Sequence, residues 1–182
     1  MNIPDNKMQD QYIAIYDNFL SDELYDECYE YAISTYNSNN MVFKTNKVWE
    51  NNIVFDSSPI LIHTLNDQNN NLSEKIIACI QYKTGLTCKF KHVHFYYFTP
   101  MSHIPWQNDV NHDGAITIYL NKKWDENTGG AFMYKNNDFI NAIYPSSNSA
   151  NIVVGDIPHC VSPTTKNSDI RITIQCFFDF FT

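Results

Sequence analysis

The sequence predicts an α+β fold that is helical in its first half and mainly β in its second. From Cys88 onward, short runs of β-branched and aromatic residues alternate with turn signals such as Gly129-Gly130 and Asn136-Asn137. Before this point, two segments carry apolar residues at helical spacing. Many short strands separated by turns indicate a sandwich or a barrel. The length of 182 residues suits one domain with its own core.

The first elements follow from local signals. Residues 1–11 are polar, and we expect a flexible arm there. Tyr12–Tyr16 alternates in bulk like a short strand. Ser21 can accept backbone hydrogen bonds as the N-cap of a helix, and the two acidic residues after it suit the positive end of the helix dipole. The asparagine-rich residues 36–40 would end this helix.

Three more elements are expected before the β-rich half. Residues 48–55 predict a strand, and residues 59–65 predict the beginning of a helix. A further helix is expected to start at Ser73 and to end at Gly85, because glycine suits a helix C-cap. The helices of the first half would then brace a sheet.

The second half is expected to be built from strands. Their expected bounds are residues 88–98, 115–120, 131–135, 139–144, 151–154 and 170–178. No internal repeat and no domain linker interrupts them, so we expect a single domain over residues 1–182.

Charge and cysteine content exclude several classes of protein. The formal net charge is -8 and the sequence pI is about 5.0, which argues against nucleic acid as a partner. No apolar run is long enough to cross a bilayer, and the N-terminus lacks the pattern of a secretion signal. The 5 cysteines are odd in number and include no Cys-x-x-Cys pair, which favours a reducing compartment. We therefore expect a soluble cytoplasmic protein; the sequence indicates no oligomeric state.

Polar residues with metal-binding chemistry occur in two segments of the β-rich half. Asp109 and His112 lie in a polar loop before one predicted strand, and His159 follows another. A carboxylate and an imidazole are ligands that suit a divalent first-row metal such as iron(II). Taken singly, Asp109 can be interpreted as an ordinary turn residue and His159 as a solvated loop residue. The order of the surrounding motifs favours the metal site.

Those motifs resemble the iron(II) and 2-oxoglutarate dependent dioxygenases, in particular the prolyl 4-hydroxylase-like family. The resemblance covers residues 95–178 well and residues 12–33 more loosely. It is carried by Ile116-Thr-Ile-Tyr-Leu-Asn-Lys-Lys-Trp-Asp125 with Gly129-Gly130, by Gly155-Asp-Ile-Pro-His-Cys-Val-Ser-Pro163, and by Arg171-Ile-Thr173. The fold it implies is a double-stranded β-helix, the jelly roll of cupin-like proteins, with the N-terminal helices packed on the larger sheet.

The resemblance also implies roles for individual residues. Asp109 and His159 match two members of a two-histidine, one-carboxylate metal site. Arg171 matches the residue that pairs with the far carboxylate of 2-oxoglutarate, for which a guanidinium fork is suited. Tyr119 matches a tyrosine that hydrogen-bonds the same carboxylate, and Tyr97 a strand tyrosine near the cosubstrate. Thr173 would add a hydroxyl donor. Alternatively, Tyr97 and Tyr119 are ordinary core aromatic residues, and Arg171 forms an ion pair at the surface.

One position departs from the family pattern. The family places its first histidine two residues before the aspartate, and this chain has Gln107 there. Gln107 could bind the metal through its amide oxygen, or His112 or His103 could take its place. Alternatively, the site binds metal poorly.

The expected activity is that of an oxidoreductase, a dioxygenase that hydroxylates a C–H bond and releases succinate and carbon dioxide. Its cofactors would be Fe(II), 2-oxoglutarate and O2, with ascorbate as an added reductant. The substrate would be a prolyl residue of a protein or peptide, or a small molecule. The rival interpretation is a non-catalytic relative that binds a ligand or peptide, because Gln107 replaces the histidine.

Overall fold

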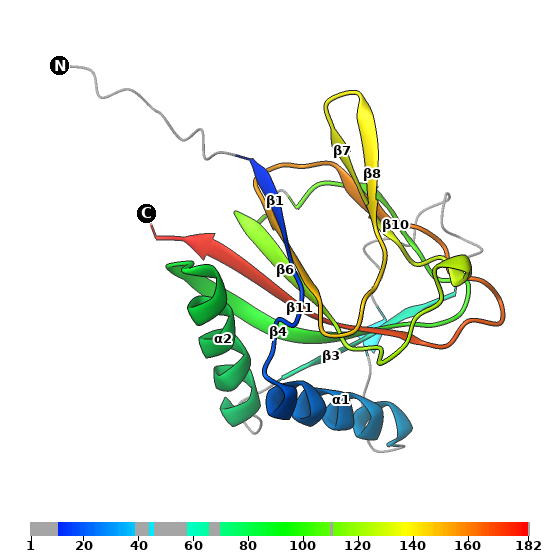
Figure 1. Cartoon of the computed structure of the whole chain (residues 1–182), viewed down its shortest axis with the longest axis horizontal. Helices are drawn as coiled ribbons and strands as arrows, with labels where there is room; N and C mark the ends of the chain where they lie inside the picture. Colours follow the sequence, from blue (N-terminus) through cyan, green and yellow to red (C-terminus); the bar gives the residue numbers. More distant parts are fainter. Residues whose placement is uncertain (1–10, 39–43, 46–57, 66–69, 110, 182) are drawn as a thin grey trace.

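Two antiparallel β-sheets face each other in the computed structural model, which describes residues 11–38, 44–45, 58–65, 70–109 and 111–181 (Figure 1). The larger sheet has the strand order β1 (Tyr12–Tyr16), β9 (Ala150–Val154), β6 (Gly114–Tyr119), β11 (Arg171–Phe180), β4 (Cys88–Phe98), β3 (Ile60–Thr64) and β2 (Lys44–Thr45). The smaller sheet has the order β5 (Ile104–Gln107), β10 (His159–Val161), β7 (Phe132–Asn136) and β8 (Phe139–Ile143). A short 3-10 helix, η3 (Glu126–Thr128), precedes β7.

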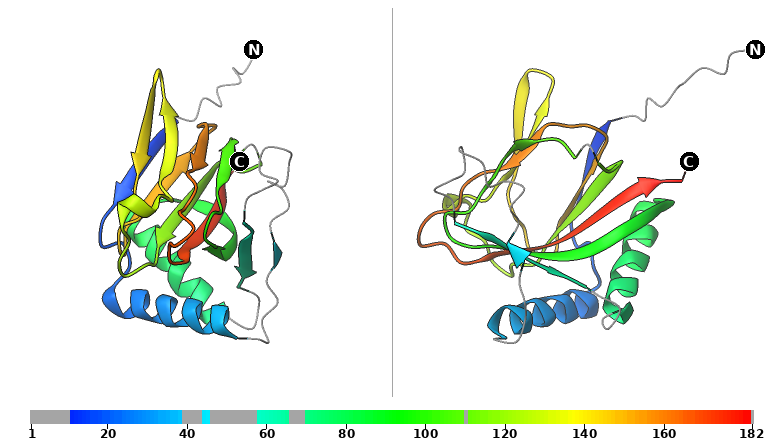
Figure 2. Two further views of the ribbon diagram at one scale, coloured as in Figure 1. Left: turned by 90° about the vertical axis from the view of Figure 1, so that its right-hand side faces the viewer. Right: turned by 180° about the vertical axis from the view of Figure 1, so that it is seen from behind.

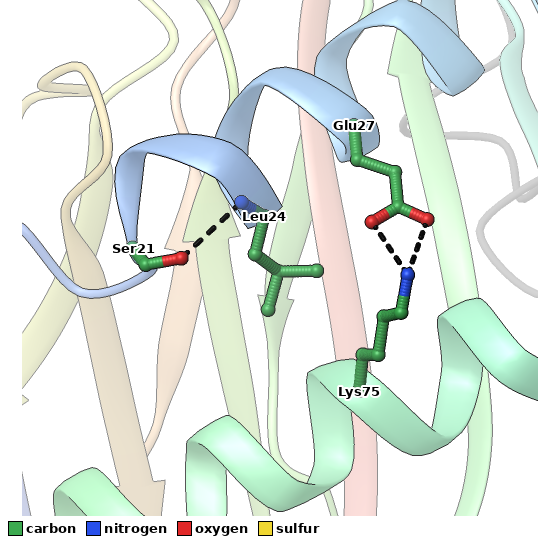
Figure 3. A network of polar contacts seen from close by, with 4 residues as sticks. All are labelled: Ser21, Leu24, Glu27 and Lys75. Carbon is green, nitrogen blue, oxygen red and sulfur yellow. Dashed lines mark hydrogen bonds and ion pairs between the residues drawn. The ribbon is translucent and has the colours of Figure 1, made fainter.

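Two helices cover the face of the larger sheet that points away from the smaller one (Figures 1 and 2). They are α1 (Asp22–Asn37) and α2 (Asn70–Thr84). Ser21 caps α1 as predicted, since its hydroxyl accepts from the Leu24 backbone N–H (3.3 Å), and Lys75 of α2 pairs with Glu27 of α1 at 2.9 Å (Figure 3). That pair is about half exposed, so it is worth about 1 kcal/mol at most. Apolar burial therefore holds the helices in place.

The larger sheet separates two cores. On β11, Ile172, Ile174 and Cys176 belong to the core shared with the helices. The alternate residues Arg171, Thr173 and Gln175 point toward the smaller sheet and line a cavity there. A second core of Phe98, Ile104, Phe132 and Val161, among others, fills part of the space between the sheets. The period of two along each strand thus decides which residues can take part in a site.

Most of the predicted elements are confirmed, and the exceptions have physical causes. Residues 59–65 were predicted to begin a helix, but Ile60–Thr64 forms β3; periodicity does not distinguish so short an apolar run from a strand. The α2 helix begins at Asn70 rather than at Ser73, and Gly85 ends it with φ 69° as expected. The short strands β5 and β10 were not predicted. The predicted strand over residues 48–55 lies outside the described residues.

No helix in the described part of the chain is long and apolar enough to cross a membrane.

A buried histidine links the helix layer to the larger sheet. Tyr31 Oη of α1 and His63 Nε2 of β3 are 2.9 Å apart. Burial lowers the pKa of His63 below its ordinary value of 6.5, so the unfolded chain takes up the proton first as the pH falls. The contribution of His63 to stability is therefore complete above that pH and declines below it.

We expect the free energy of unfolding, measured by urea denaturation, to fall between about pH 7 and about pH 5. His63→Phe should flatten this slope. Tyr31→Phe should retain the slope, because burial and not the hydrogen bond lowers the pKa. An unchanged slope in His63→Phe would show that other groups cause the acid sensitivity.

Candidate active site

A cavity of about 210 Å³ lies between the two sheets. The larger sheet contributes Arg171 and Thr173 to its wall, the smaller sheet contributes Gln107 and His159, and the loop after β5 contributes Asp109. The structure therefore gathers five of the predicted site residues around one space, although they are spread over 67 positions of the sequence, from 107 to 173.

Asp109 and His159 meet at the cavity wall. His159 Nε2 lies 3.5 Å from Asp109 Oδ2, and His159 Nδ1 lies 2.8 Å from the carbonyl oxygen of Ile157. A carbonyl oxygen only accepts, so the proton of a neutral ring resides on Nδ1 and the Nε2 lone pair faces Asp109. A backbone contact of this kind fixes the ring of a metal-binding histidine. The pair thus presents one oxygen and one nitrogen donor to the same point.

Burial raises the pKa of Asp109 above its ordinary value, while His159 and His112 counteract this effect. Removing a carboxylate from water is costly unless a cation compensates it. A divalent cation bound beside Asp109 would reverse the shift and favour the ionised form. The carboxylate is therefore in a setting that suits a metal ligand better than a solvated turn residue.

Gln107 lies beside this pair. It is the last residue of β5, directly opposite His159 in the antiparallel pairing, and it lines the cavity. The register shift between His159 and Val161 places Gln107 on the cavity side while the adjacent Trp106 points outward, where Lys135 lies 5.2 Å from its ring. Among the described residues, no third histidine, cysteine or acidic side chain completes a metal cluster.

The two alternative histidines are placed differently. His112 lines the cavity, but its ring packs on Phe177 with 4.8 Å between centroids, and its Nδ1 lies 3.5 Å from Asp179 Oδ1. These contacts hold His112 against the end of β11. His103 does not line the cavity, and four residues of extended chain separate it from Gln107 by about 13 Å. Gln107 is thus the best-placed candidate for a third ligand.

Arg171, the only arginine in the sequence, lines the cavity. Its residue is 1% exposed, and within the described part of the chain its Nε and Nη1 atoms have no hydrogen-bond partner. Aromatic faces support the guanidinium, with Phe98 at 4.4 Å and Tyr119 at 5.2 Å. A Cβ on Gly130 would stand 3.0 Å from Arg171 Cδ, so the Gly-Gly motif makes room for this side chain. Arg171 is therefore not a surface ion-pair residue.

Such an arrangement calls for an anion. A buried guanidinium with unpaired donors is unstable unless a ligand supplies acceptor oxygens. Burial lowers the pKa of Arg171, although Tyr119 counteracts this effect. A carboxylate with two oxygens in one plane matches the guanidinium fork.

Tyr119 lies next to Arg171 but makes a contact that was not predicted. Its hydroxyl donates to Asn151 Oδ1 at 2.7 Å, and both residues are fully buried. A tyrosine hydroxyl has one proton, so in this arrangement it offers only lone pairs to its other neighbours. Tyr119 contacts Arg171 through its ring and through a hydrogen bond between the two side chains, in which its hydroxyl oxygen accepts. Its role as a hydrogen-bond partner of the cosubstrate carboxylate stays a prediction.

Tyr97, which was expected near the cosubstrate, is not among the residues that line the cavity. Its side chain points toward α1, where its hydroxyl donates to the Ala32 carbonyl oxygen at 3.0 Å and its ring stacks on Tyr36. Successive residues of a strand face opposite sides, so the neighbouring Tyr96 lines the cavity instead. The aromatic residues 95–98 are buried on both faces of the strand. The sequence alone therefore does not show which of them face the cavity.

Several cavity residues were not predicted. Aromatic side chains make up much of the wall, and two polar residues, Thr117 and Gln175, join Thr173 on the larger sheet. The aromatic members are Tyr96, Phe98, Phe132 and Phe177. A signal for Gln175 was present, because residues two and four positions after Arg171 on a strand share its face. Thr173 lines the cavity as expected, and its role as a donor remains a prediction.

Solved structures with the same fold include prolyl hydroxylases of low sequence identity and an alpha ketoglutarate dependent epimerase. A prolyl hydroxylase from Trichoplax adhaerens, in complex with a hypoxia inducible factor oxygen degradation domain peptide fragment, matches with a TM-score of 0.76 at 16% identity, covering 92% of this chain and 83% of the other. A Pseudomonas putida prolyl-4-hydroxylase gives 0.70 at 15%, covering 95% of each chain. The viral collagen prolyl hydroxylase of Paramecium Bursaria Chlorella virus-1, in a 2OG complex, gives 0.66 at 15%, covering 94% of this chain and 97% of the other.

These similarities establish the class of fold, the double-stranded β-helix that the resemblance implied. The profile described as the 2OG-Fe(II) oxygenase superfamily matches residues 79–179, more than half of the chain. The chain therefore belongs to the 2OG-Fe(II) oxygenase superfamily, whose members are 2-oxoglutarate-dependent oxygenases that use Fe(II), 2-oxoglutarate and O2. No curated protein matches the sequence closely enough to count as a relative.

Proposed function

We propose that this protein is a 2-oxoglutarate-dependent dioxygenase that hydroxylates a C–H bond of a prolyl residue in a protein or peptide. One observation carries the proposal: a buried arginine, two of whose nitrogen atoms have no hydrogen-bond partner in the described part of the chain, shares a cavity with a carboxylate and an imidazole that converge on one point. The similarity of the fold to prolyl hydroxylases supports the choice of a prolyl substrate.

The residues of the cavity fit both cofactors. Asp109 and His159 would hold iron(II), because His159 Nε2 and Asp109 Oδ2 lie 3.5 Å apart and offer one nitrogen and one oxygen donor. Gln107 would supply a neutral amide oxygen as third ligand. Arg171 would bind the far carboxylate of 2-oxoglutarate, with Tyr119 beneath the guanidinium and Thr173 alongside as a hydroxyl donor.

In the overall reaction, one oxygen atom of O2 enters the C–H bond of the substrate and the other enters succinate, which forms from 2-oxoglutarate as carbon dioxide leaves. Bound iron(II) would supply the site at which O2 is reduced. Arg171 orients the cosubstrate, and the aromatic walls exclude water from the reacting groups. The protein contributes binding, orientation and a dry cavity.

All five cysteines are free thiols, which supports a reducing compartment and hence the cytoplasm as location.

Anaerobic titration with iron(II) and then 2-oxoglutarate tests the assembly of this site without a substrate. We expect a visible charge-transfer band that saturates with 2-oxoglutarate, together with slow succinate formation once O2 is admitted. Asp109→Ala should abolish the band, because it removes the charged ligand. Lys135→Met, a change of a cation on the outer face of the smaller sheet, should leave the band intact.

Gln107 favours a second candidate, a binding module with the same cavity but no turnover. In that case 2-oxoglutarate would still bind to the protein, measured by calorimetry, while neither the band nor succinate would exceed the level of Asp109→Ala. That combination of results would reject the enzyme and retain the ligand-binding site.

A further inference from the structure

Five polar residues form a row across the inner side of the larger sheet. They lie opposite one another in the strand pairing, one from each of five neighbouring strands (Figure 1). From β9 through β6, β11 and β4 to β3 they are Asn151, Thr117, Gln175, His94 and Thr64. Buried or half-buried polar groups in a sheet lower stability unless they are paired or bind a ligand. We refer to these five residues as the polar row.

The central member, Gln175, is oriented by its neighbour. The Thr117 hydroxyl donates to Gln175 Oε1 at 2.7 Å, so the amide oxygen is engaged. On the other side, His94 Nδ1 lies 2.9 Å from Thr64 Oγ1. Among the described residues, the amide nitrogen of Gln175 has no hydrogen-bond partner, and Gln175 lines the cavity. The amide thus offers a donor to whatever occupies this space.

The position of Gln175 along β11 indicates which part of a ligand it meets. Arg171 and Gln175 both line the cavity, and Gln175 is four residues further along the same face of the strand, about 13 Å away at Cα. The loop that carries Asp109 is attached near the other end of β11, because Asp113 N–H donates to the Phe178 carbonyl oxygen at 3.1 Å. Gln175 therefore lies between the anion-binding arginine and the loop with the metal-binding carboxylate.

We propose that Gln175, held by Thr117, donates a hydrogen bond to the 2-oxoglutarate carboxylate nearest the metal ligands, and that Thr117 is the positioning residue for this contact. The inference rests on the proposed function, since it requires 2-oxoglutarate to lie with its far carboxylate on Arg171. The donor is uncharged and fixed, so it aligns the reacting end of the cosubstrate without adding a second cation to the cavity.

Two probes separate the ends of the cosubstrate: 2-oxoglutarate and 2-oxopentanoate, which has the same chain length but no far carboxylate. Affinities are measured by anaerobic calorimetry on the iron(II)-loaded full-length protein. Gln175→Met should weaken both probes about tenfold, because a charge-assisted hydrogen bond is lost. Arg171→Met should weaken only 2-oxoglutarate.

Two more variants test the orientation of the amide. Gln175→Glu keeps the size and still accepts from Thr117, but it should weaken both probes about 100-fold or more, because it brings a negative charge to a carboxylate. Thr117→Val should weaken both about threefold, because the amide is then free to turn. Thr64→Val changes the other end of the polar row, does not touch the cavity, and should leave both affinities unchanged.

The outcomes are distinct. If the wild-type protein binds neither probe, the proposed function fails. If the wild-type protein binds 2-oxoglutarate and Gln175→Met binds it equally well, the role of Gln175 is rejected while the proposed function stands. A loss confined to 2-oxoglutarate would assign Gln175 to the far carboxylate and would also overturn the inference.

Discussion

Arg171→Met is expected to weaken 2-oxoglutarate binding by at least about 30-fold, because removal of one member of a buried hydrogen-bonded charge pair costs about 2 to 5 kcal/mol. The same substitution should raise the melting temperature of the ligand-free protein. Arg171 is buried, and two of its nitrogen atoms have no hydrogen-bond partner among the residues that the structure describes. The ligand-free fold therefore contains a desolvated cation, and an apolar side chain of similar length would remove this cost. Calorimetry with 2-oxoglutarate and thermal unfolding without it measure the two effects.

The opposite signs make this prediction specific. A variant that lost affinity through misfolding would also lose stability. If Arg171 instead binds the ligand at the expense of stability, its replacement lowers the affinity and raises the melting temperature. Lys135→Met, which removes a cation stacked on the outward-facing Trp106, is the matched control and should change neither quantity. Unchanged affinity in Arg171→Met would remove the arginine from the cosubstrate site and would leave its burial unexplained.

The fold and the candidate site residues could be predicted because they depend on the order of motifs along the chain. The Tyr-Leu-Asn and Gly-Gly motifs, the histidine after Pro158 and the single arginine occur in one sequence order, and the structure brings Asp109, His159 and Arg171 to one cavity. The amphipathic pattern after Ser21 likewise required only the chain itself.

The remaining features depend on the phase of strands and on contacts between distant residues. Tyr96 and Tyr97 are both buried, so hydrophobicity did not show which of them faces the cavity. The Tyr119 hydroxyl donates its proton to Asn151 Oδ1, which is 32 residues away in the sequence, on β9. The register shift that turns Gln107 inward involves His159 and Val161 of another strand. Pairings of this kind arise from tertiary packing and leave no periodic signal in the sequence.

Gln107 decides how strongly the proposed centre holds its metal. An amide oxygen is neutral and harder than imidazole nitrogen, so a glutamine in the third position should bind iron(II) more weakly than the histidine of the family pattern. Asp109 then supplies the only negative charge of the three ligands, and its burial makes the metal-free site unfavourable. A weak third ligand would leave metal affinity dependent on the cosubstrate, which also binds the metal.

Gln107→His is expected to raise iron(II) affinity by about 10 to 100-fold, a range comparable to the effect of disturbing residues around metal ligands. Position 107 lies opposite His159 and lines the cavity, so the new imidazole should reach the point where Asp109 and His159 converge. Gln107→Ala should lower the iron(II) affinity below that of the wild type if the amide oxygen is a ligand. Anaerobic calorimetry with iron(II) alone measures all three proteins without requiring turnover.

Trp106→His provides the matched control for this substitution. It introduces the same imidazole one residue earlier on β5, where the side chain faces Lys135 and solvent, so iron(II) affinity should remain that of the wild type. If Gln107→His and Trp106→His behaved alike, position 107 would not be a ligand position. His112→Phe would then show whether the histidine packed on Phe177 supplies the third donor, because its loss would abolish the remaining affinity.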